Sequence, residues 1–199
     1  MTTRWDELWP KIDDIPGWLS KAEGETLYNA AKTASEFHPI TIIEIGSYCG
    51  RSTACFAFGL LDSLFDGTPG RIISIDHHIG SPEIVNGPKD TFPYLQETLR
   101  RLDLSRFVIP VVTTSRQASW LTIPCDVLFI DGDHRFEFVN EDAQIWLSHL
   151  RSSGIALFHD YVSATGPRMV VDRLIDSGLW SVHHKIDDLI QLERTPMHS

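Results

Sequence analysis

The fold is decided by the stretch Ile42-Ile43-Glu44-Ile45-Gly46-Ser47-Tyr48-Cys49-Gly50-Arg51-Ser52-Thr53. Its apolar, β-branched beginning is typical of a strand that is buried on both faces. The run breaks at Gly46 and Gly50 and continues into residues 54–65, which have helical spacing. A strand, a glycine-bearing turn and a helix N-terminus bring backbone N–H groups close to a ligand. The stretch therefore predicts a ligand-binding turn, with an ordinary strand-to-helix turn as the alternative.

The composition is that of a single globular domain. The 199 residues are 42% hydrophobic and 22% charged, which suits one domain with a full core. The net charge of -10 argues against a nucleic-acid partner, because phosphate binding needs a basic surface. The sequence shows neither a secretory signal pattern nor an apolar run that could span a bilayer. We expect a small-molecule partner, no membrane, and a homo-oligomer as the default state.

The cysteines and the N-terminal segment give two further expectations. Three cysteines without CxxC spacing indicate a reduced, cytoplasmic setting. Residues 1–20 are expected to form an N-terminal arm, and residues 21–199 a single domain. The arm carries three tryptophans, and it either covers one edge of the core or closes as a flap over a site. Ser20 and Glu23 have the spacing of a capping box, which predicts a helix from 21 to about 37.

Strands and helices alternate along the rest of the chain, which predicts a mostly parallel sheet with helices on both faces. The expected strands after the first are 71–75, 107–112, 126–130 and 155–158, and the expected helices are 92–102, 136–150 and 167–177. Residues 180–186 and 189–193 are expected to form a terminal hairpin. Residues 77–93 form a long polar loop that we interpret as a lid or substrate loop. Glu141 and Asp142 are expected on the solvated side of their helix.

Polar side chains gather where these strands end, and ligands bind beyond the carboxyl ends of parallel strands. The residues concerned are Glu44, Asp76, Asp131, Asp133, His134, His159 and Asp160. Asp76 has the position from which a carboxylate binds the hydroxyl pair of a ribose, and the alternative is a strand-end carboxylate that caps the next turn. Thr114 and Ser115 follow the third strand and offer hydroxyls to the base of a ligand.

If the fourth and fifth strands are neighbours, about 4.8 Å apart, Asp131 and Asp160 converge on one spot. Two adjacent carboxylates repel unless something compensates, and a divalent cation such as Mg²⁺, Ca²⁺ or Mn²⁺ would do so. His159 as a further ligand would favour Mn²⁺, Zn²⁺ or Fe²⁺. The alternative is that Asp131 and Asp133 stabilise turns and His159 packs in the core. His134 is a candidate general base, or else a surface or capping histidine.

The glycine stretch, Ile75-Asp76, Phe129-Ile130-Asp131-Gly132-Asp133-His134 and Phe158-His159-Asp160-Tyr161 together resemble the class I S-adenosylmethionine-dependent methyltransferases. The subgroup they resemble more closely is methyltransferase family 24, which includes macrolide sugar O-methyltransferases and cephalosporin-hydroxylase-like proteins. The similarity runs from about Gly17 to the terminal strands. The run FIDGDH is its most specific part, and the glycine turn is more generic.

This resemblance implies a Rossmann-like α/β fold, with a seven-stranded, mostly parallel sheet whose last strand is antiparallel. It also implies a cofactor site for S-adenosyl-L-methionine, formed by Glu44, Gly46, Ser47, Gly50, Ser52, Thr53, Asp76, Thr114, Ser115 and Asp131. In metal-dependent relatives, the residues that match Asp131, His159 and Asp160 hold Mg²⁺, and the residue that matches His134 is the base. The sequence departs from those relatives at His159, where they carry a glutamate.

The expected function is therefore O-methylation of a hydroxyl on a sugar, polyketide or phenol. Asp131 and His134 are the expected catalytic residues, and Asp131, His159 and Asp160 the expected ligands of Mg²⁺ or Mn²⁺. Two alternatives remain at this point: a non-catalytic cofactor-binding or interaction protein, and a cephalosporin-hydroxylase-like metal-assisted enzyme.

Overall fold

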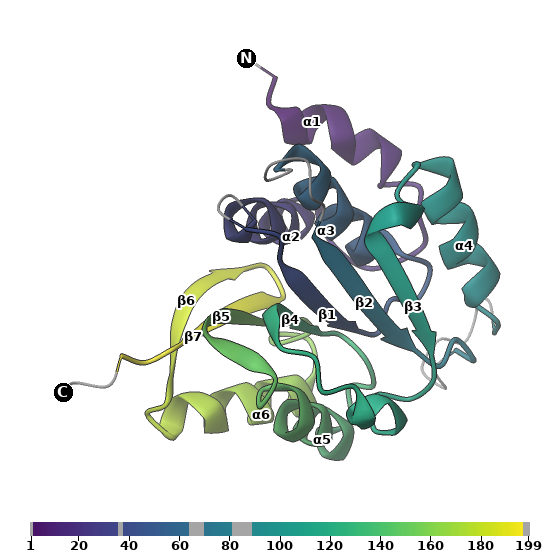
Figure 1. Ribbon diagram of the computed structural model, residues 1–199. Helices are drawn as coiled ribbons and strands as arrows, with labels where there is room; N and C mark the ends of the chain where they lie inside the picture. The colour runs from purple at the N-terminus through teal and green to yellow at the C-terminus, as the bar shows by residue number, and fades with distance from the viewer. Residues whose placement is uncertain (1, 36–37, 64–69, 81–88, 197–199) are drawn as a thin grey trace.

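A seven-stranded sheet forms the centre of the computed structural model, which describes residues 2–35, 38–63, 70–80 and 89–196. The strand order is β3-β2-β1-β4-β5-β7-β6 (Figure 1). The strands are β1 (Thr41–Ile45), β2 (Arg71–Asp76), β3 (Val108–Val112), β4 (Cys125–Ile130), β5 (Leu150–Phe158), β6 (Trp180–Ile186) and β7 (Leu189–Arg194). The pairs among β1 to β5 are parallel, and β7 runs antiparallel to both of its neighbours. The predicted sheet is confirmed.

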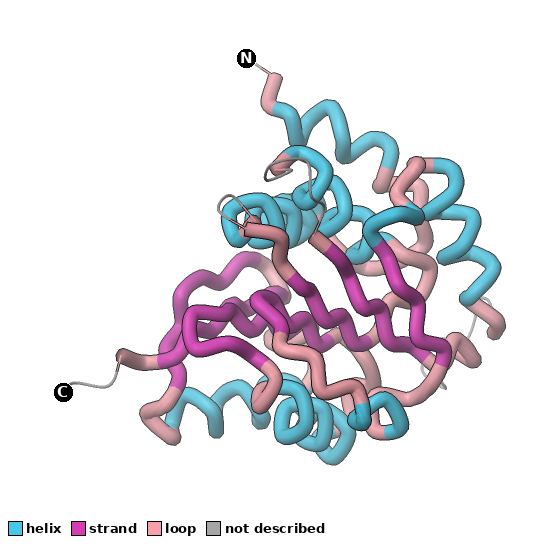
Figure 2. The backbone as a smooth tube through the Cα atoms, viewed as in Figure 1, coloured by secondary structure: helices cyan, strands magenta, loops and turns pink. Residues whose placement is uncertain are grey.

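Helices cover both faces of this sheet (Figures 1 and 2). The helices are α1 (Arg4–Leu8), α2 (Lys21–Ala34), α3 (Arg51–Asp62), α4 (Phe92–Arg101), α5 (Phe136–Trp146) and α6 (Thr165–Asp176). The first four share one hydrophobic cluster with the sheet, and α5 and α6 share the other. The capping box of Ser20 and Glu23 begins α2 as predicted. No described helix is long and apolar enough to cross a membrane.

The boundary between α5 and β5 differs from the prediction. The helix ends at Trp146, and Leu150 already belongs to β5. Both side chains are buried, so their spacing imitates one more helical turn. The expected turn at 153–154 lies inside β5, where Cys125 pairs with Leu150 but Val127 pairs with Ile155. The extra residues on β5 form an irregularity in the register that the periodicity of the sequence did not indicate.

Helix α3 begins three residues earlier than expected, at Arg51. Gly50 is its N-cap and has a φ of +92°, so the chain enters the helix directly from the glycine turn. The expected ends of α2 at 37 and of α3 at 65 lie outside the described residues. Residues 81–88 of the predicted lid loop also lie outside them.

The N-terminal segment packs on the core and then runs past the sheet edge where the strands end. Trp5, Leu8, Ile12 and Ile15 are buried. The guanidinium of Arg51 donates hydrogen bonds to backbone carbonyl oxygens of this segment, at 2.8 Å for that of Ile15. The segment thus covers core, as one of the two interpretations expected, and it is also attached to the helix that follows the glycine turn.

Gly46, the residue after β1, lies directly against the backbone of the turn after β4. Its φ is +87°, and a Cβ at this position would lie 2.1 Å from the backbone carbonyl oxygen of Asp131. The amide N–H of Asp131 donates to the carbonyl of Ile45 at 2.9 Å. Only glycine fits here, because both the backbone conformation and the space exclude a side chain.

We predict that Gly46→Ala destabilises the protein much more than Gly178→Ala. Gly178 also has a positive φ, +72°, but an added Cβ would meet nothing within 4 Å. Gly178→Ala, the control, should therefore lower the free energy of unfolding only by the cost of a positive φ, about 1–2 kcal/mol. Gly46→Ala also creates a steric clash and should lower it by roughly 3 kcal/mol or more. Denaturant unfolding measures both. Equal losses would show that the contact with Asp131 does not constrain the fold.

Candidate active site

The glycine turn is held in place by the carboxylate at the end of β2. The backbone N–H groups of Ser47 and Tyr48 donate to Oδ2 of Asp76 at 3.0 and 2.8 Å. The N–H of His78 donates to the other oxygen at 2.7 Å. Tyr48 has a φ of +47°, an uncommon conformation for a side chain of its size. Asp76 thus fixes the shape of the turn, and each of its carboxylate oxygens can accept further hydrogen bonds.

Glu44, near the end of β1, is buried and is not among the residues that line the cleft described below. Its side chain is fully buried and accepts hydrogen bonds from the hydroxyls of Ser52 at 2.6 Å and Thr53 at 2.7 Å. Burial raises the pKa of Glu44 to about 7, although these two hydrogen bonds oppose the rise. Glu44 therefore acts on the start of α3, and any effect on a ligand passes through Ser52.

The acidic residues after β4 and β5 converge as predicted, because the two strands are neighbours and Ile130 pairs with Phe158. Nε2 of His134 lies 2.8 Å from Oδ2 of Asp160. Nδ1 of His159 lies 3.3 Å from Oδ1 of Asp131 and 3.1 Å from Oδ2 of Asp160. Asp160 has a φ of +56°, a costly conformation of the kind that gathers at functional sites.

His159 is buried, and its second ring nitrogen faces a third carboxylate. Nε2 lies 3.5 Å from Oε2 of Glu23. Burial alone would lower the pKa of His159, but Asp131, Asp160 and Glu23 raise it well above its usual range. The contact with His159 holds the pKa of Glu23 below its usual range, against the effect of burial. The contacts with His134 and then His159 do the same for the pKa of Asp160. The pKa of Asp131 is raised, because its burial outweighs the attraction of His159.

The predicted metal set of Asp131, His159 and Asp160 does not fit a divalent cation. A metal-bound imidazole must offer a lone pair, whereas Nδ1 of His159 forms a hydrogen bond with Oδ2 of Asp160 at 3.1 Å. Nε2 faces Oε2 of Glu23 at 3.5 Å, an ion-pair distance and not a hydrogen bond. Since both nitrogens face carboxylates, both contacts are favourable when the ring carries N–H groups, not when it offers a lone pair to a cation. Asp131, His134 and Asp160 do bring ligand atoms within 4.8 Å of one another. However, Oδ2 of Asp160 is already in contact with both His134 and His159, so a cation would have to compete with two imidazoles for this oxygen.

Two aspartates differ from the expectation: Asp133 was grouped with the polar strand ends, and Asp142 was expected on the solvated side of its helix. Asp133 pairs with the guanidinium of Arg135 and stays outside the carboxylate cluster. Asp142 is buried, not solvated, and accepts a short hydrogen bond from the hydroxyl of Ser115. Burial raises the pKa of Asp142 to about 6, although the bond from Ser115 opposes this. The expectation that Asp142 faces solvent was wrong, because the loop after β3 covers that side of α5.

One cleft of about 1570 Å³ joins the glycine turn to the carboxylate cluster. Ten of the predicted site residues line it: Gly46, Ser47, Ser52, Asp76, Thr114, Ser115, Asp131, His134, His159 and Asp160. Three others, Glu44, Gly50 and Thr53, are not among its lining residues. The cleft also contains residues that the sequence did not single out for it, namely Glu23, Asp142 and Asp188. Residues 16–20 of the N-terminal arm line it as well.

An aromatic pair stands at this cleft. The Trp18 side chain is 66% exposed, and its ring lies 5.3 Å from that of Tyr48. Trp18 belongs to the segment whose carbonyls Arg51 binds, at 2.9 Å for that of Leu19. The flap interpretation is thus supported in position, since segment 16–20 lines the cleft.

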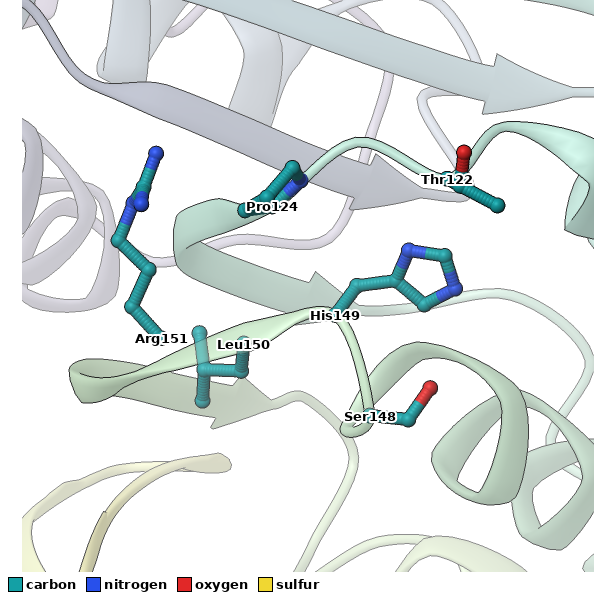
Figure 3. Close-up of a pocket in the computed structure, with 6 residues that line it drawn as sticks. All are labelled: Thr122, Pro124, Ser148, His149, Leu150 and Arg151. Atoms are coloured by element: carbon teal, nitrogen blue, oxygen red, sulfur yellow. The ribbon is translucent and has the colours of Figure 1, made fainter.

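A smaller hollow of about 370 Å³ lies at the opposite edge of the sheet, where β4 and β5 begin (Figure 3). Its lining residues are Thr122, Pro124, Ser148, His149, Leu150 and Arg151. It includes no carboxylate, and Arg151 pairs with Asp126 at 3.1 Å. The large cleft therefore carries the candidate chemistry.

The sheet order, the glycine turn and the acidic strand ends define the class I methyltransferase architecture. A family model described as a methyltransferase domain, methyltransferase family 24, matches residues 43–161. Because the match covers more than half of the chain, the protein belongs to this family and is a methyltransferase.

Solved structures share the whole fold at low sequence identity. The O-methyltransferase NovP matches with a TM-score of 0.72 and 15% identity over 96% of this chain and 88% of its own. An O-methyltransferase from Bacillus cereus in complex with S-adenosylhomocysteine gives 0.68 and 15%, over 96% and 90% of the two chains. The methyltransferase PaMTH1 of Podospora anserina, also bound to S-adenosylhomocysteine, gives 0.68 and 15%, over 96% and 88%.

We predict that Glu44→Gln flattens the dependence of stability on pH. A carboxyl group whose pKa rises from 4.5 to about 7 on folding holds more protons folded than unfolded across this interval. Its contribution is therefore retained below the lower pKa and lost as pH rises through the higher one, by about 3 kcal/mol. The free energy of unfolding, measured between these pH values, should fall less in Glu44→Gln than in wild type.

The exposed Glu97, on α4, provides the control for this measurement. Glu97→Gln should keep the wild-type slope over the same pH interval. A Glu44→Gln protein with an unchanged slope would show that Glu44 is not protonated by burial.

Proposed function

We propose that this methyltransferase transfers the methyl group of S-adenosyl-L-methionine to a hydroxyl of a small molecule. The observation that carries the proposal is the contact of His134 with Asp160, at 2.8 Å, in the same cleft as the glycine turn. Two solved structures of the same fold hold S-adenosylhomocysteine, the product of such a transfer. These two structures support S-adenosyl-L-methionine as the cofactor, and they do not indicate the acceptor.

In this proposal the cofactor lies along the carboxyl ends of β1, β2 and β3. The N-terminal end of α3 and the turn 46–50 hold its methionine part, where backbone N–H groups and Ser52 meet the cleft. Asp76 accepts hydrogen bonds from the ribose hydroxyls. Thr114 and Ser115 lie beside the adenine. Glu44, Gly50 and Thr53 contribute by fixing the turn and the start of α3.

His134 is the proposed general base. Asp160, whose Oδ2 lies 2.8 Å from Nε2 of His134, would stabilise the charge that the ring gains when it takes the proton of the acceptor hydroxyl. Bound S-adenosyl-L-methionine would supply an electrophilic methyl group to the hydroxyl oxygen and leave as S-adenosylhomocysteine, while the imidazole of His134 would take the hydroxyl proton. Because the sulfonium is already electrophilic, the main work of the protein is to align donor and acceptor. Asp131 borders the turn and the base, where the two substrates meet.

The acceptor is proposed to be a sugar, polyketide or phenol with an apolar part. Trp18, Tyr48, Ile79 and Phe138 all line the cleft, and three of them are substantially exposed. Such surfaces bind planar or apolar groups. The net charge of -10 disfavours a polyanionic acceptor.

We predict that S-adenosylhomocysteine binds the wild-type protein and that Asp76→Asn weakens binding by at least about tenfold. The substitution removes the charge that a ribose hydroxyl pair contacts and one of the oxygens that fix the turn. Isothermal calorimetry measures both proteins, with Glu97→Gln as the control that should bind like wild type. Failure of the wild-type protein to bind would overturn the proposed function.

We also predict that His134→Gln and Asp131→Asn each reduce turnover by about 100-fold or more, while affinity for S-adenosylhomocysteine changes little. Transfer of a labelled methyl group to a panel of hydroxyl compounds measures turnover, and calorimetry measures affinity. Equal losses of turnover and affinity would contradict the catalytic roles. Cofactor binding without transfer to any compound of the panel would favour the non-catalytic alternative.

A further inference from the structure

The imidazole of His159 is surrounded by three carboxylates. Nδ1 lies 3.3 Å from Asp131 and 3.1 Å from Asp160, and Nε2 lies 3.5 Å from Glu23. The His159 side chain is only 5% exposed, so water does little to screen these charges. Carboxylates so close together require a compensating positive charge.

Glu23 is a fixed part of this arrangement. It is the N3 residue of the capping box of α2, and its Oε2 accepts the backbone N–H of Ser20 at 2.7 Å. Its Oε1 accepts the N–H of Asp188, from the turn between β6 and β7, at 2.8 Å. Two backbone donors from distant segments therefore direct this carboxylate at the second nitrogen of His159.

His159 lies where it contacts both carboxylates that would hold a divalent cation. It lies just beyond the paired ends of β4 and β5, and its Nδ1 is 3.3 Å from Asp131 and 3.1 Å from Asp160. A cation added there would meet an imidazole that is itself directed at both carboxylates. The two positive groups would compete for the same oxygens.

We propose that His159, anchored by Glu23, takes the place of a divalent cation and that this site works without bound metal. His159 is then a positioning residue: it holds Asp131 and Asp160, and Asp160 in turn orients His134. The role in methyl transfer rests on the proposed function, but the exclusion of metal rests on the geometry alone.

The test is binding of Mn²⁺ alone, followed by the loss of the electron paramagnetic resonance signal of free Mn²⁺ in metal-free protein. Wild type should leave the signal unchanged. His159→Glu, which replaces the internal cation by a third carboxylate beside the aspartates, should bind Mn²⁺ at least about tenfold more tightly. Mn²⁺ should raise the melting temperature of His159→Glu and not that of wild type.

A double variant, Asp131→Asn with His159→Glu, is the matched control and should lose the acquired binding. If His159→Glu is unfolded without metal, folding on addition of Mn²⁺ supports the same conclusion. Specific Mn²⁺ binding by wild type, abolished by Asp131→Asn, would overturn the proposal. So would a His159→Glu protein that is folded and binds Mn²⁺ no better than wild type.

The catalytic consequence has a separate readout. Methyl transfer by wild type should be unaffected by a chelator, and His159→Gln should lower turnover without changing the affinity for S-adenosylhomocysteine. Loss of activity with chelator, restored by Mg²⁺ or Mn²⁺, would overturn the proposal. The Mn²⁺ measurement needs neither cofactor nor acceptor, so its failure is distinguishable from failure of the proposed function.

Discussion

The backbone of Asp131 passes so close to Gly46 that no side chain fits between them. This contact sets the distance between the glycine turn after β1 and the acidic turn after β4, because the amide of Asp131 is bonded to Ile45. The turn and the cluster are therefore joined directly through the backbone, without an intervening side chain. In a reaction that depends on alignment, such a constraint between two rigid strand ends is more useful than any loop contact.

The sequence was most informative where a local pattern and the global fold agree. The β-branched run before Gly46, the capping box at Ser20 and the acidic strand ends each predict a feature that the structure contains. It was least informative where a residue is placed by a distant segment. Leu150 continues the helical spacing of α5 but pairs with Cys125 in the sheet, and Asp142 is buried by the loop after β3. Periodicity records which side chains are buried, not which element buries them.

In the candidate site, too, the sequence predicts what local patterns determine and misses what distant segments determine. The convergence of Asp131 and Asp160 follows from the order of two parallel strands, which the alternating pattern of the chain predicts. The environment of His159 depends on Glu23, which belongs to helix α2. The capping box of that helix already accounts for a glutamate at this position. No sequence signal distinguishes a glutamate that only caps a helix from one that also faces a buried histidine. The chemistry of the cluster, as opposed to its location, therefore required the structure.

The hydrogen bond from the amide of Asp188 to Glu23 joins residues that are 165 positions apart. A chain made from its N-terminus exposes α2 and its carboxylate long before the turn between β6 and β7 exists. During synthesis Glu23 and His159 can meet, but the last backbone donor arrives only with the terminal hairpin. The environment of His159 therefore depends on the hairpin of β6 and β7, because the turn of that hairpin supplies one of the two backbone donors that hold Glu23.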